Sequence, residues 1–573
     1  MKYLDDLKGK VSHTGDDIAK QTIDEFEDDA FIKTPDEIYN WKLITVALTA
    51  AAAAIIIGYD AGFIGGTVAL ESFQQEFGLD KMTPSERTTV NANVVSVFQA
   101  GAFWGALFFY PVGETWGRKI GLILSGFLLT FGAGISLYLK QSTGLGAIYA
   151  GRVLTGIGIG GCSGLAPIYI SEISPAQIRG KLVGCWEVSW QIGGIVGYWI
   201  NYGVLQNIPT SRKQWIIPFA LQLVPSGIFW LGTLIIPESP RFFISRGKLH
   251  QAKAVLSNLR MLPPDDNYLV HEFHNMVKDI EDKQSRLNGK TGFLAPVIKC
   301  ITSKTLLYRL LLSTSLFIFQ NGYGINAITY YSPTVFKSFG INGTDASLQS
   351  TGIFGILKGT ASVFFVFVVV ERFGRRAALI WFSFPCAICM WYIGAYVKLA
   401  NPAARVARGD IHMDAGGKAA QAMLYIWTFF YGASWNGTPW VINSEIFSQE
   451  VRTFTQAVNA ASNWFWAFVM GRWTGEAIAT IGYKLYFIFA TMVTISPVVV
   501  YLFYPETKSV PLEAIDHLFE VSAWRARKHA LQQFLVEYQE GTFGHQLEFL
   551  QDAKVVEKAT EEEKNSTISS TKL

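Results

Sequence analysis

Charged residues are scarce in this chain. Asp, Glu, Lys and Arg together make up only 16% of the 573 residues, whereas 50% are hydrophobic. Charge is rare in a series of apolar runs of about 20 residues, the length of helix that crosses the hydrocarbon core of a bilayer. A soluble protein of this length could bury a core without such runs. The sequence therefore predicts an all-α integral membrane protein.

The residues that support most enzyme chemistry are also few. The five cysteines (Cys162, Cys185, Cys300, Cys386 and Cys389) show no metal-binding spacing, and we interpret them as inert packing residues. The sequence contains no recognisable nucleotide-binding loop, metal cluster or nucleophile with a matching base. We therefore expect neither an enzyme nor an ATP-driven pump. We also expect no cofactor, no metal and no nucleic-acid partner.

The first 40 residues are polar and acidic, so they do not form a secretory signal peptide, and the first apolar segment is expected to act as the signal anchor. We predict twelve membrane spans: 43–64, 91–112, 120–139, 146–170, 183–204, 215–236, 309–332, 350–370, 377–398, 421–443, 455–478 and 484–504. The predicted organisation is an N-terminal tail (1–42), a six-helix bundle (43–236), a helical linker (237–308), a second six-helix bundle (309–504) and a C-terminal tail (505–573).

The second bundle repeats short charged patterns of the first. Residues 114–119 (ETWGRK) recur as 371–376 (ERFGRR), 171–173 (SEI) recur as 444–446, and 237–239 (PES) recur as 505–507 (PET). The three patterns return in the same order at nearly one spacing, about half of the chain, which indicates a duplicated unit. Duplicated membrane units are typical of transporters whose site lies at the interface between the halves.

Basic residues predict which side of the membrane each loop faces. The Lys and Arg residues of the short loops do not decide the orientation of the chain. The linker carries about a dozen of these residues, and loops rich in Lys and Arg stay in the cytoplasm. We therefore expect both tails inside and small helices over 248–288. Asn342, in the sequence Asn342-Gly343-Thr344, would then face outside and could be glycosylated. No retention signal is recognisable, so the plasma membrane is the expected location.

Most charges lie at the ends of the predicted spans. We interpret those in the repeated patterns as a cytoplasmic gate, a network of ion pairs that locks the halves together on one side. The alternative is simple anchoring at the lipid headgroups. The gate residues are Glu114, Arg118, Glu172, Arg179, Glu238, Arg241, Glu371, Arg375, Arg376, Glu445, Arg452 and Glu506.

Three charges lie deeper. Asp60 is in span 1, Arg152 begins span 4 and Lys358 is in the middle of span 8. An ionisable group at the centre of a membrane helix costs about 2.5–3.5 kcal/mol, so it usually faces a cavity or a partner. Asp60 and Arg152 could pair, and a carboxylate that meets either an arginine or a proton is a plausible coupling device. The alternative is a static structural pair.

Lys358 has no acidic neighbour in its own span. An anionic substrate could compensate its charge. Two alternatives remain open: an acid in another span, or a side chain that snorkels to the outer surface.

Amides and tryptophans gather in the remaining polar spans. Amides both donate and accept hydrogen bonds, which suits a substrate rich in hydroxyls, and indole faces suit the C–H faces of a ring. The same amides could instead bond helix to helix. The candidates are Gln191, Gln320, Asn321, Asn326, Asn436, Trp440, Asn463 and Trp464.

The chain resembles the sugar porter branch of the major facilitator superfamily. The matching segments are 58–60 (GYD), 151–152 (GR), 237–241 (PESPR), 320–326 (QNGYGIN), 371–376 and 505–508 (PETK). Within the branch the chain is most similar to the quinate permeases of fungi. That similarity is carried by 190–194, 213–218, 330–338 and 434–440.

The resemblance implies twelve helices in two pseudo-symmetric bundles that work by alternating access. It places the proton-coupling pair on Asp60 and Arg152, and the sugar contacts on Gln191, Gln320, Asn321, Asn326, Trp440, Asn463 and Trp464. Two positions depart from hexose carriers: Lys358 stands where they usually have asparagine, and Tyr431 where several have an acid. Relative to hexose carriers, this chain gains a positive charge at one position and lacks a negative charge at the other. Both differences favour a carboxylate substrate.

We therefore expect a monomeric carrier in the lipid bilayer that imports a polyhydroxylated monocarboxylate, such as quinate or galacturonate, together with a proton. The main alternative is a proton symporter of neutral hexoses or pentoses in which Lys358 is structural. A nutrient sensor that retains the same fold is a further alternative.

Overall fold

The computed structural model describes residues 35–138, 144–287, 292–341, 343–408, 413–448, 450–508, 510 and 515–539. Asn342, the predicted glycosylation site, lies outside these residues, as does the side chain of Glu371. The described residues divide into two compact units, one ending at Tyr504 and the other beginning at Pro505. The first unit contains all the long apolar helices.

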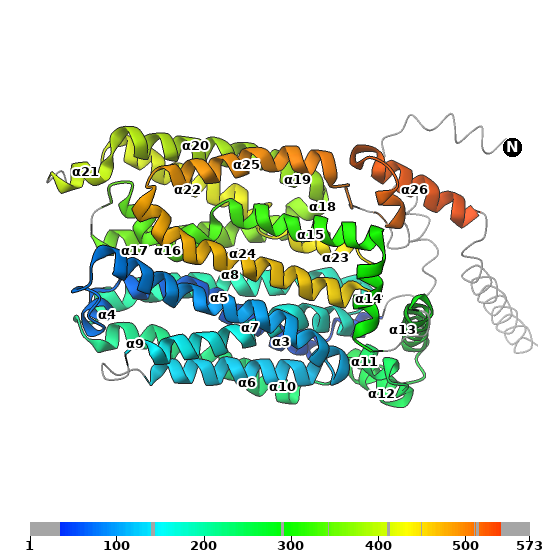
Figure 1. The fold of residues 1–573 in the computed structure, drawn as a ribbon. Coiled ribbons are helices and arrows are strands. Elements are labelled where there is room, and N and C mark those ends of the chain that lie inside the picture. The colour runs from blue at the N-terminus through cyan, green and yellow to red at the C-terminus, as the bar shows by residue number, and fades with distance from the viewer. Residues whose placement is uncertain are drawn as a thin grey trace, which may run out of the picture. The chain divides into compact units, whose positions relative to one another are not determined.

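The first half of residues 30–504 consists of long helices and a few short ones. These are η1 (Asp36–Tyr39), α3 (Trp41–Ala69), α4 (Glu71–Glu76), α5 (Pro84–Thr115), α6 (Arg118–Leu137), α7 (Gly146–Ile173), α8 (Ala176–Asn207), α9 (Arg212–Leu221) and α10 (Leu223–Ile235) (Figure 1). Local sequence explains the boundaries. Thr83 and Glu86 form a capping box ahead of α5, and Pro84 occupies its first position.

The second half repeats the pattern with more interruptions. Its helices are α15 (Lys304–Gly322), α16 (Ile325–Lys337), α17 (Thr344–Phe364), a π-helical turn (Phe365–Val369), α18 (Val370–Arg372), α19 (Arg375–Trp381), α20 (Ser383–Ala400), α21 (Pro402–Ala407), α22 (Ala415–Gly432), α23 (Thr438–Glu445), α24 (Arg452–Thr480) and α25 (Lys484–Phe503) (Figure 1). The repeated motif turns alike in both halves, because Gly117 and Gly374 both adopt positive φ, at 108° and 86°.

Four predicted spans divide between two helices, and two of these breaks lie beside predicted amides. Span 309–332 divides between α15 and α16, where Gly324 adopts a φ of 89°. Span 421–443 divides between α22 and α23. Glycine stands at each of these two breaks, Gly324 at the first and Gly437 at the second. At the second break, backbone oxygens accept hydrogen bonds from the side chain of Gln320.

The linker and the C-terminal tail form short helices. The linker has α11 (Pro240–Ser245), α12 (Leu249–Arg260), α13 (Asn267–Arg286) and α14 (Leu294–Thr302), and Ile244, Leu256 and Leu269 form part of a small core of its own. In the other unit, η5 (Asp516–Phe519) packs with α26 (Ala523–Gln539) around Leu518 and Ala526.

Within the described residues, eight helices are long and apolar enough to cross a membrane: those over 41–69, 84–115, 118–137, 146–173, 212–235, 344–369, 375–400 and 484–503. The other four predicted spans correspond to α8, α15 with α16, α22 with α23, and α24. These four carry the predicted amides. The all-α membrane fold predicted from the sequence is confirmed.

Helices α3 and α8 approach until their backbones touch. A Cβ built on Gly58 would lie 1.8 Å from Trp190 O, and one built on Gly193 would lie 2.0 Å from Ile55 O. Small residues permit this close packing of membrane helices. The contact fixes the face of α8 that carries the candidate site.

Candidate substrate site and charge networks

A central pocket lies between the two halves. Helices α3 and α8 of the first half and α17 of the second contribute to its wall. Its lining residues are Gly58, Ala61, Trp190, Gln191, Gly194, Ile195, Tyr198, Gly355 and Lys358. The pocket therefore combines an amide, a cation and aromatic faces, and two of the predicted substrate residues, Gln191 and Lys358, line it.

Lys358 reaches the pocket from α17 and is 9% exposed. No hydrogen bond or carboxylate oxygen within 4.0 Å engages its Nζ atom among the described residues. The opposite charge that acts on Lys358 is Glu187, on the first-half helix α8. Lys358 thus faces the pocket with an acid nearby but without a direct ion pair.

Glu187 is the functional candidate that the sequence analysis missed. Its carboxylate accepts hydrogen bonds from Gln191 Nε2 at 2.6 Å and from Asn436 Nδ2 at 2.5 Å. Asn436 Nδ2 also lies 3.3 Å from Ser362 Oγ. Glu187 precedes Gln191 by one helical turn on the same face, and that spacing was the signal in the sequence that could have identified it.

The predicted amides fall into two groups. Gln320 Nε2 donates to the backbone oxygens of Trp435 and Asn436, both at 2.9 Å, and so binds the break between α22 and α23. The second group is a chain at the break between α15 and α16. There Asn326 donates to Asn321, and Asn321 Nδ2 lies 3.4 Å from Asn463 Oδ1. Several amides therefore bond helix to helix in this state.

The two predicted tryptophans differ in their surroundings. Trp464 stacks on Trp190 of the pocket wall, with ring centroids 6.3 Å apart, and its Nε1 donates to Ser163 Oγ at 3.1 Å. This contact crosses from α24 to the first half. Trp440 packs edge-on against Phe317 within the second half, at 4.9 Å. Trp464 is the one that lies against the pocket.

Asp60 and Arg152 form a buried pair. Two hydrogen bonds of 3.1 and 3.2 Å join the guanidinium to the two carboxylate oxygens, and Gln222 Nε2 donates to Asp60 Oδ1 at 2.9 Å. Asp60 is fully buried and Arg152 is 2% exposed. The pair lies within the first half. Gly58 and Ala61, on either side of Asp60 in the sequence, line the pocket.

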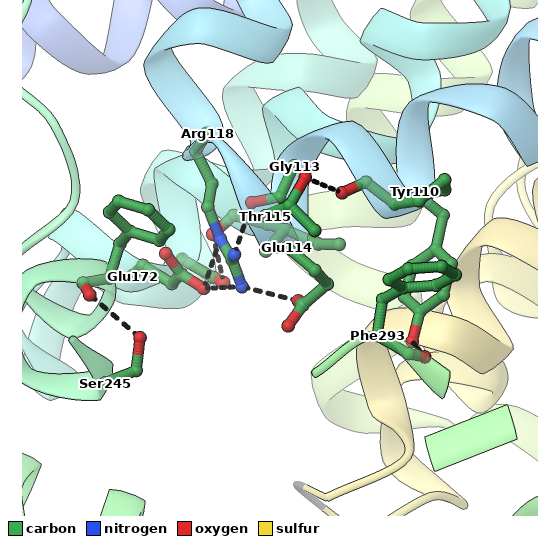
Figure 2. A network of polar contacts seen from close by, with 12 residues as sticks. Tyr110, Gly113, Glu114, Thr115, Arg118, Glu172, Ser245 and Phe293 are labelled. Carbon is green, nitrogen blue, oxygen red and sulfur yellow. Dashed lines mark hydrogen bonds and ion pairs between the residues drawn. The ribbon is translucent and has the colours of Figure 1, made fainter. Parts of the chain in front are cut away.

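The end of the bundle that carries the repeated charged patterns, here called the motif end, has a dense network in the first half. Figure 2 shows Arg118 pointing between Glu114 and Glu172. Its Nη2 lies 2.9 Å from Glu114 and 3.1 Å from Glu172, and its Nη1 donates to Gly113 O at 2.7 Å. The backbone N–H groups of Arg118, Lys119 and Ser239 donate to Glu238. Burial nevertheless raises the pKa of the Glu238 carboxyl.

The second half has a related but smaller arrangement. Arg375 binds Glu445 with Nη2 at 2.7 Å and Nε at 3.2 Å. Arg376 donates to Tyr501 O at 2.7 Å and lies over the Tyr501 ring. In the other unit, the Glu506 carboxylate accepts the backbone N–H of Thr507 and of Lys508.

These contacts differ from the predicted lock between halves. The ion pairs of Arg118 and Arg375 connect helices of the same half, and Arg241 pairs with Asp279 inside the linker at 2.9 Å. Arg452 lies within electrostatic reach of Arg179 and of Arg241 in the linker, which repel it, and of Glu450 and Glu445, which attract it. Arg452 donates to Phe447 O in its own half. Charges of both signs therefore act on Arg452, and the gate between halves stays a prediction.

The opposite end of the bundle is closely packed around α16. A Cβ on Gly65 of α3 would lie 2.1 Å from Tyr330 O, and Tyr331 Oη donates to Gly471 O at 2.7 Å. On α17, a Cβ on Gly355 would lie 2.4 Å from the Tyr198 ring. The halves therefore meet tightly on this side of the pocket.

Comparison with known proteins identifies the family. The chain matches the model of the "Sugar (and other) transporter" family over residues 46–519. It is 46% identical over 516 residues to a probable quinate permease of Aspergillus flavus, covering 90% of this chain and 95% of that protein. A probable quinate permease of Aspergillus niger is also 46% identical over 516 residues, covering 90% and 94%.

The fold is shared with solved transporters. The xylose transporter XylE from E. coli, in a partially occluded inward-open conformation, is 24% identical and superposes with a TM-score of 0.66 over 82% of this chain and 99% of that one. The same protein, described as a major facilitator superfamily proton:xylose symporter bound to a bromodeoxyglucose, gives 24% identity and a TM-score of 0.67 over 83% and 99%. The chain therefore shares the fold of a solved major facilitator superfamily transporter. It belongs to the sugar transporter family and is a multi-pass membrane transporter rather than an enzyme.

Proposed function

We propose that this protein imports a polyhydroxylated monocarboxylate together with a proton, by alternating access of its two halves. The observation that carries the proposal is Lys358, a cation on the wall of the central pocket that makes no direct ion pair there among the described residues. A buried ammonium is costly, and a bound carboxylate would compensate it. Curated relatives named quinate permeases support an acid of this kind.

The remaining pocket residues suit the rest of such a substrate. The Gln191 amide offers hydrogen-bonding groups to hydroxyls, and the indole of Trp190 offers a flat face to the C–H side of a ring. Gln320 and Asn436 extend the polar surface toward the break between α22 and α23. Quinate and galacturonate both combine one carboxylate with several hydroxyls, so the proposal covers both.

The proton is assigned to the Asp60–Arg152 pair. When protonated, the carboxyl no longer balances the guanidinium, so the pair must rearrange. Because the pair lies behind the pocket wall, its rearrangement would move α3, which forms part of that wall. The named proton symporter of the same fold supports this assignment.

A neutral-sugar carrier is the second candidate. Glu187 favours it, because an acid within electrostatic reach of Lys358 partly compensates the cation without any substrate. On either proposal we place the tails and the linker in the cytoplasm and the protein in the plasma membrane as a monomer. The predicted bundles at 43–236 and 309–504 would then move as the two halves.

Uptake measurements test the proposal. Radiolabelled quinate, galacturonate, glucose and xylose would be offered to cells that lack native carriers, at two external pH values. We expect uptake of an acid that rises at low pH and collapses with an uncoupler. Uptake of sugars without acids would overturn the proposal in favour of a neutral-sugar carrier.

A further inference from the structure

Glu187 and Lys358 are opposite charges that belong to different halves and meet at the same pocket. Glu187 lies on α8 one turn before the lining residue Gln191, and Lys358 lines the pocket from α17. Each acts electrostatically on the other, but no nitrogen–oxygen distance of 4.0 Å or less joins them. The space between them is therefore not closed by a direct ion pair.

The other groups that face Glu187 are neutral at physiological pH. Gln191 and Asn436 donate hydrogen bonds to its carboxylate, and the Ser362 hydroxyl and the Tyr431 phenol lie within its reach. From α3, the pocket wall receives only Gly58 and Ala61 among the described residues. Lys358 is thus the cation that balances Glu187 in this surrounding.

A carboxylate substrate changes this balance. With the pocket empty, one anion faces one cation. A bound acid anion would place two carboxylates around one ammonium, and two like charges sharing a site favour protonation of one of them. Restoring neutrality requires either that one carboxylate leaves or that one carboxylate takes up a proton.

We propose that the substrate carboxylate replaces Glu187 as the partner of Lys358, and that Glu187 binds one proton from solution as the anion binds. The charges balance: Glu187 and Lys358 sum to zero before binding, and protonated Glu187, Lys358 and the substrate anion sum to zero afterwards. Each acid anion therefore enters the site with one proton. This inference rests on the proposed acid transport and adds a second protonation site to it.

The roles of Glu187 and Asp60 are then different. Asp60 already has a direct partner in Arg152, is fully buried and stays within one half. Glu187 instead bonds the pocket-lining Gln191 and also Asn436 of the other half. Protonation of Glu187 should set the pH dependence of substrate binding, whereas Asp60 should govern the use of the proton gradient during transport.

The experiment measures binding to the purified full-length protein in lipid nanodiscs. Calorimetric titration with quinate and with galacturonate, in buffers of different ionisation enthalpy, gives both the affinity and the number of protons taken up. We expect about one proton per bound anion in the wild-type protein, and an affinity that falls up to about tenfold per unit rise in pH once Glu187 is ionised. The variant Glu187→Gln retains hydrogen-bonding groups at this position but cannot titrate. It should bind the acid with nearly the same affinity at every pH and with proton uptake near zero.

Glu476→Gln is the matched control, because Glu476 is an acid on α24 that pairs with Arg472 and does not line the central pocket. It should retain the wild-type proton uptake. Retained proton uptake and pH dependence in Glu187→Gln would overturn the inference. So would binding of an acid to the wild-type protein without proton uptake, a measurement that needs no variant to fold and leaves the proposed substrate intact. Failure of both acids to bind at any pH would overturn the proposed substrate itself.

Discussion

The charges of this protein divide into those paired within one half and those that face each other across the halves. Asp60 with Arg152 and Arg118 with Glu172 make direct contacts near 3 Å inside the first half. Across the halves, Glu187 and Lys358 attract without an ion pair, and Arg179 repels Arg452. The comparison indicates that direct ion pairs hold each half rigid. The charges between halves remain available to a substrate or to a change of state.

Neutralising the paired acid should have the largest effect. Asp60→Asn removes the proton-binding group while retaining a hydrogen-bonding side chain beside Arg152 and Gln222. We expect the accumulation ratio of the acid to fall, while exchange of labelled for unlabelled substrate continues. Uptake against a gradient and counterflow in proteoliposomes measure the two properties separately. Undiminished uphill uptake would remove Asp60 from the coupling mechanism.

Removing the cation of the motif-end network should destabilise the first half. Arg118→Ala leaves Glu114 and Glu172 without the guanidinium that contacts both of them, whereas Glu238 keeps its bond from the backbone N–H of residue 118. Breaking a buried ion pair costs about 3–5 kcal/mol of unfolding free energy. We expect a clear loss of thermal stability in detergent.

The related arginine of the second half provides the control. The Arg375 side chain is 16% exposed against 8% for Arg118, so solvent compensates more of its loss. Arg375→Ala should therefore lower the midpoint of thermal unfolding by less than Arg118→Ala does. Equal losses from the two substitutions would show that burial does not determine the strength of these networks.

The unpaired cation should matter for affinity rather than stability. Lys358→Asn removes the proposed partner of the substrate carboxylate, and hydrogen bonds to charged groups contribute about 1.5–3 kcal/mol. Binding of the acid should weaken about 10- to 100-fold, since each 1.4 kcal/mol is tenfold in affinity. Binding of a neutral sugar should change little. An equal effect on acid and sugar would make Lys358 a structural residue.

How much the sequence could predict differs between fold and site. The apolar runs and the repeated motifs were sufficient to predict the all-α membrane fold, because both can be recognised in the sequence without knowledge of tertiary contacts. The breaks at Gly324 and at Asn436 were not among the predictions, and the second is bound by a side chain from another helix. Gln320 shows this directly, because it donates to the backbone of the second break.

Glu187 was missed for a related reason. It lies near the end of its predicted span, where a charge is ordinary, and nothing in its own helix shows that Asn436 and Lys358 approach from the other half. The gate arginines illustrate the same limit. Sequence can place Arg179 and Arg452 at equivalent positions of the repeat, but only the structure shows that Arg179 and Arg241 act on Arg452 together with Glu445 and Glu450.

Removing one of these facing arginines should have the smallest effect. Arg452→Ala relieves repulsion by Arg179 and Arg241, so it should favour the state in which the halves approach at the motif end. Single exposed or half-buried charge interactions contribute about 0.2–1 kcal/mol, so the ratio of states should shift only about 1.4- to 5-fold. The accessibility of cysteines introduced at the motif end measures that ratio. Arg452→Lys retains the charge and should leave the ratio close to that of the wild-type protein. If Arg452→Ala instead shifted the protein toward the state with an open motif end, this arginine would join the halves through a contact made in another state. The division between paired and facing charges would then hold for only one conformation.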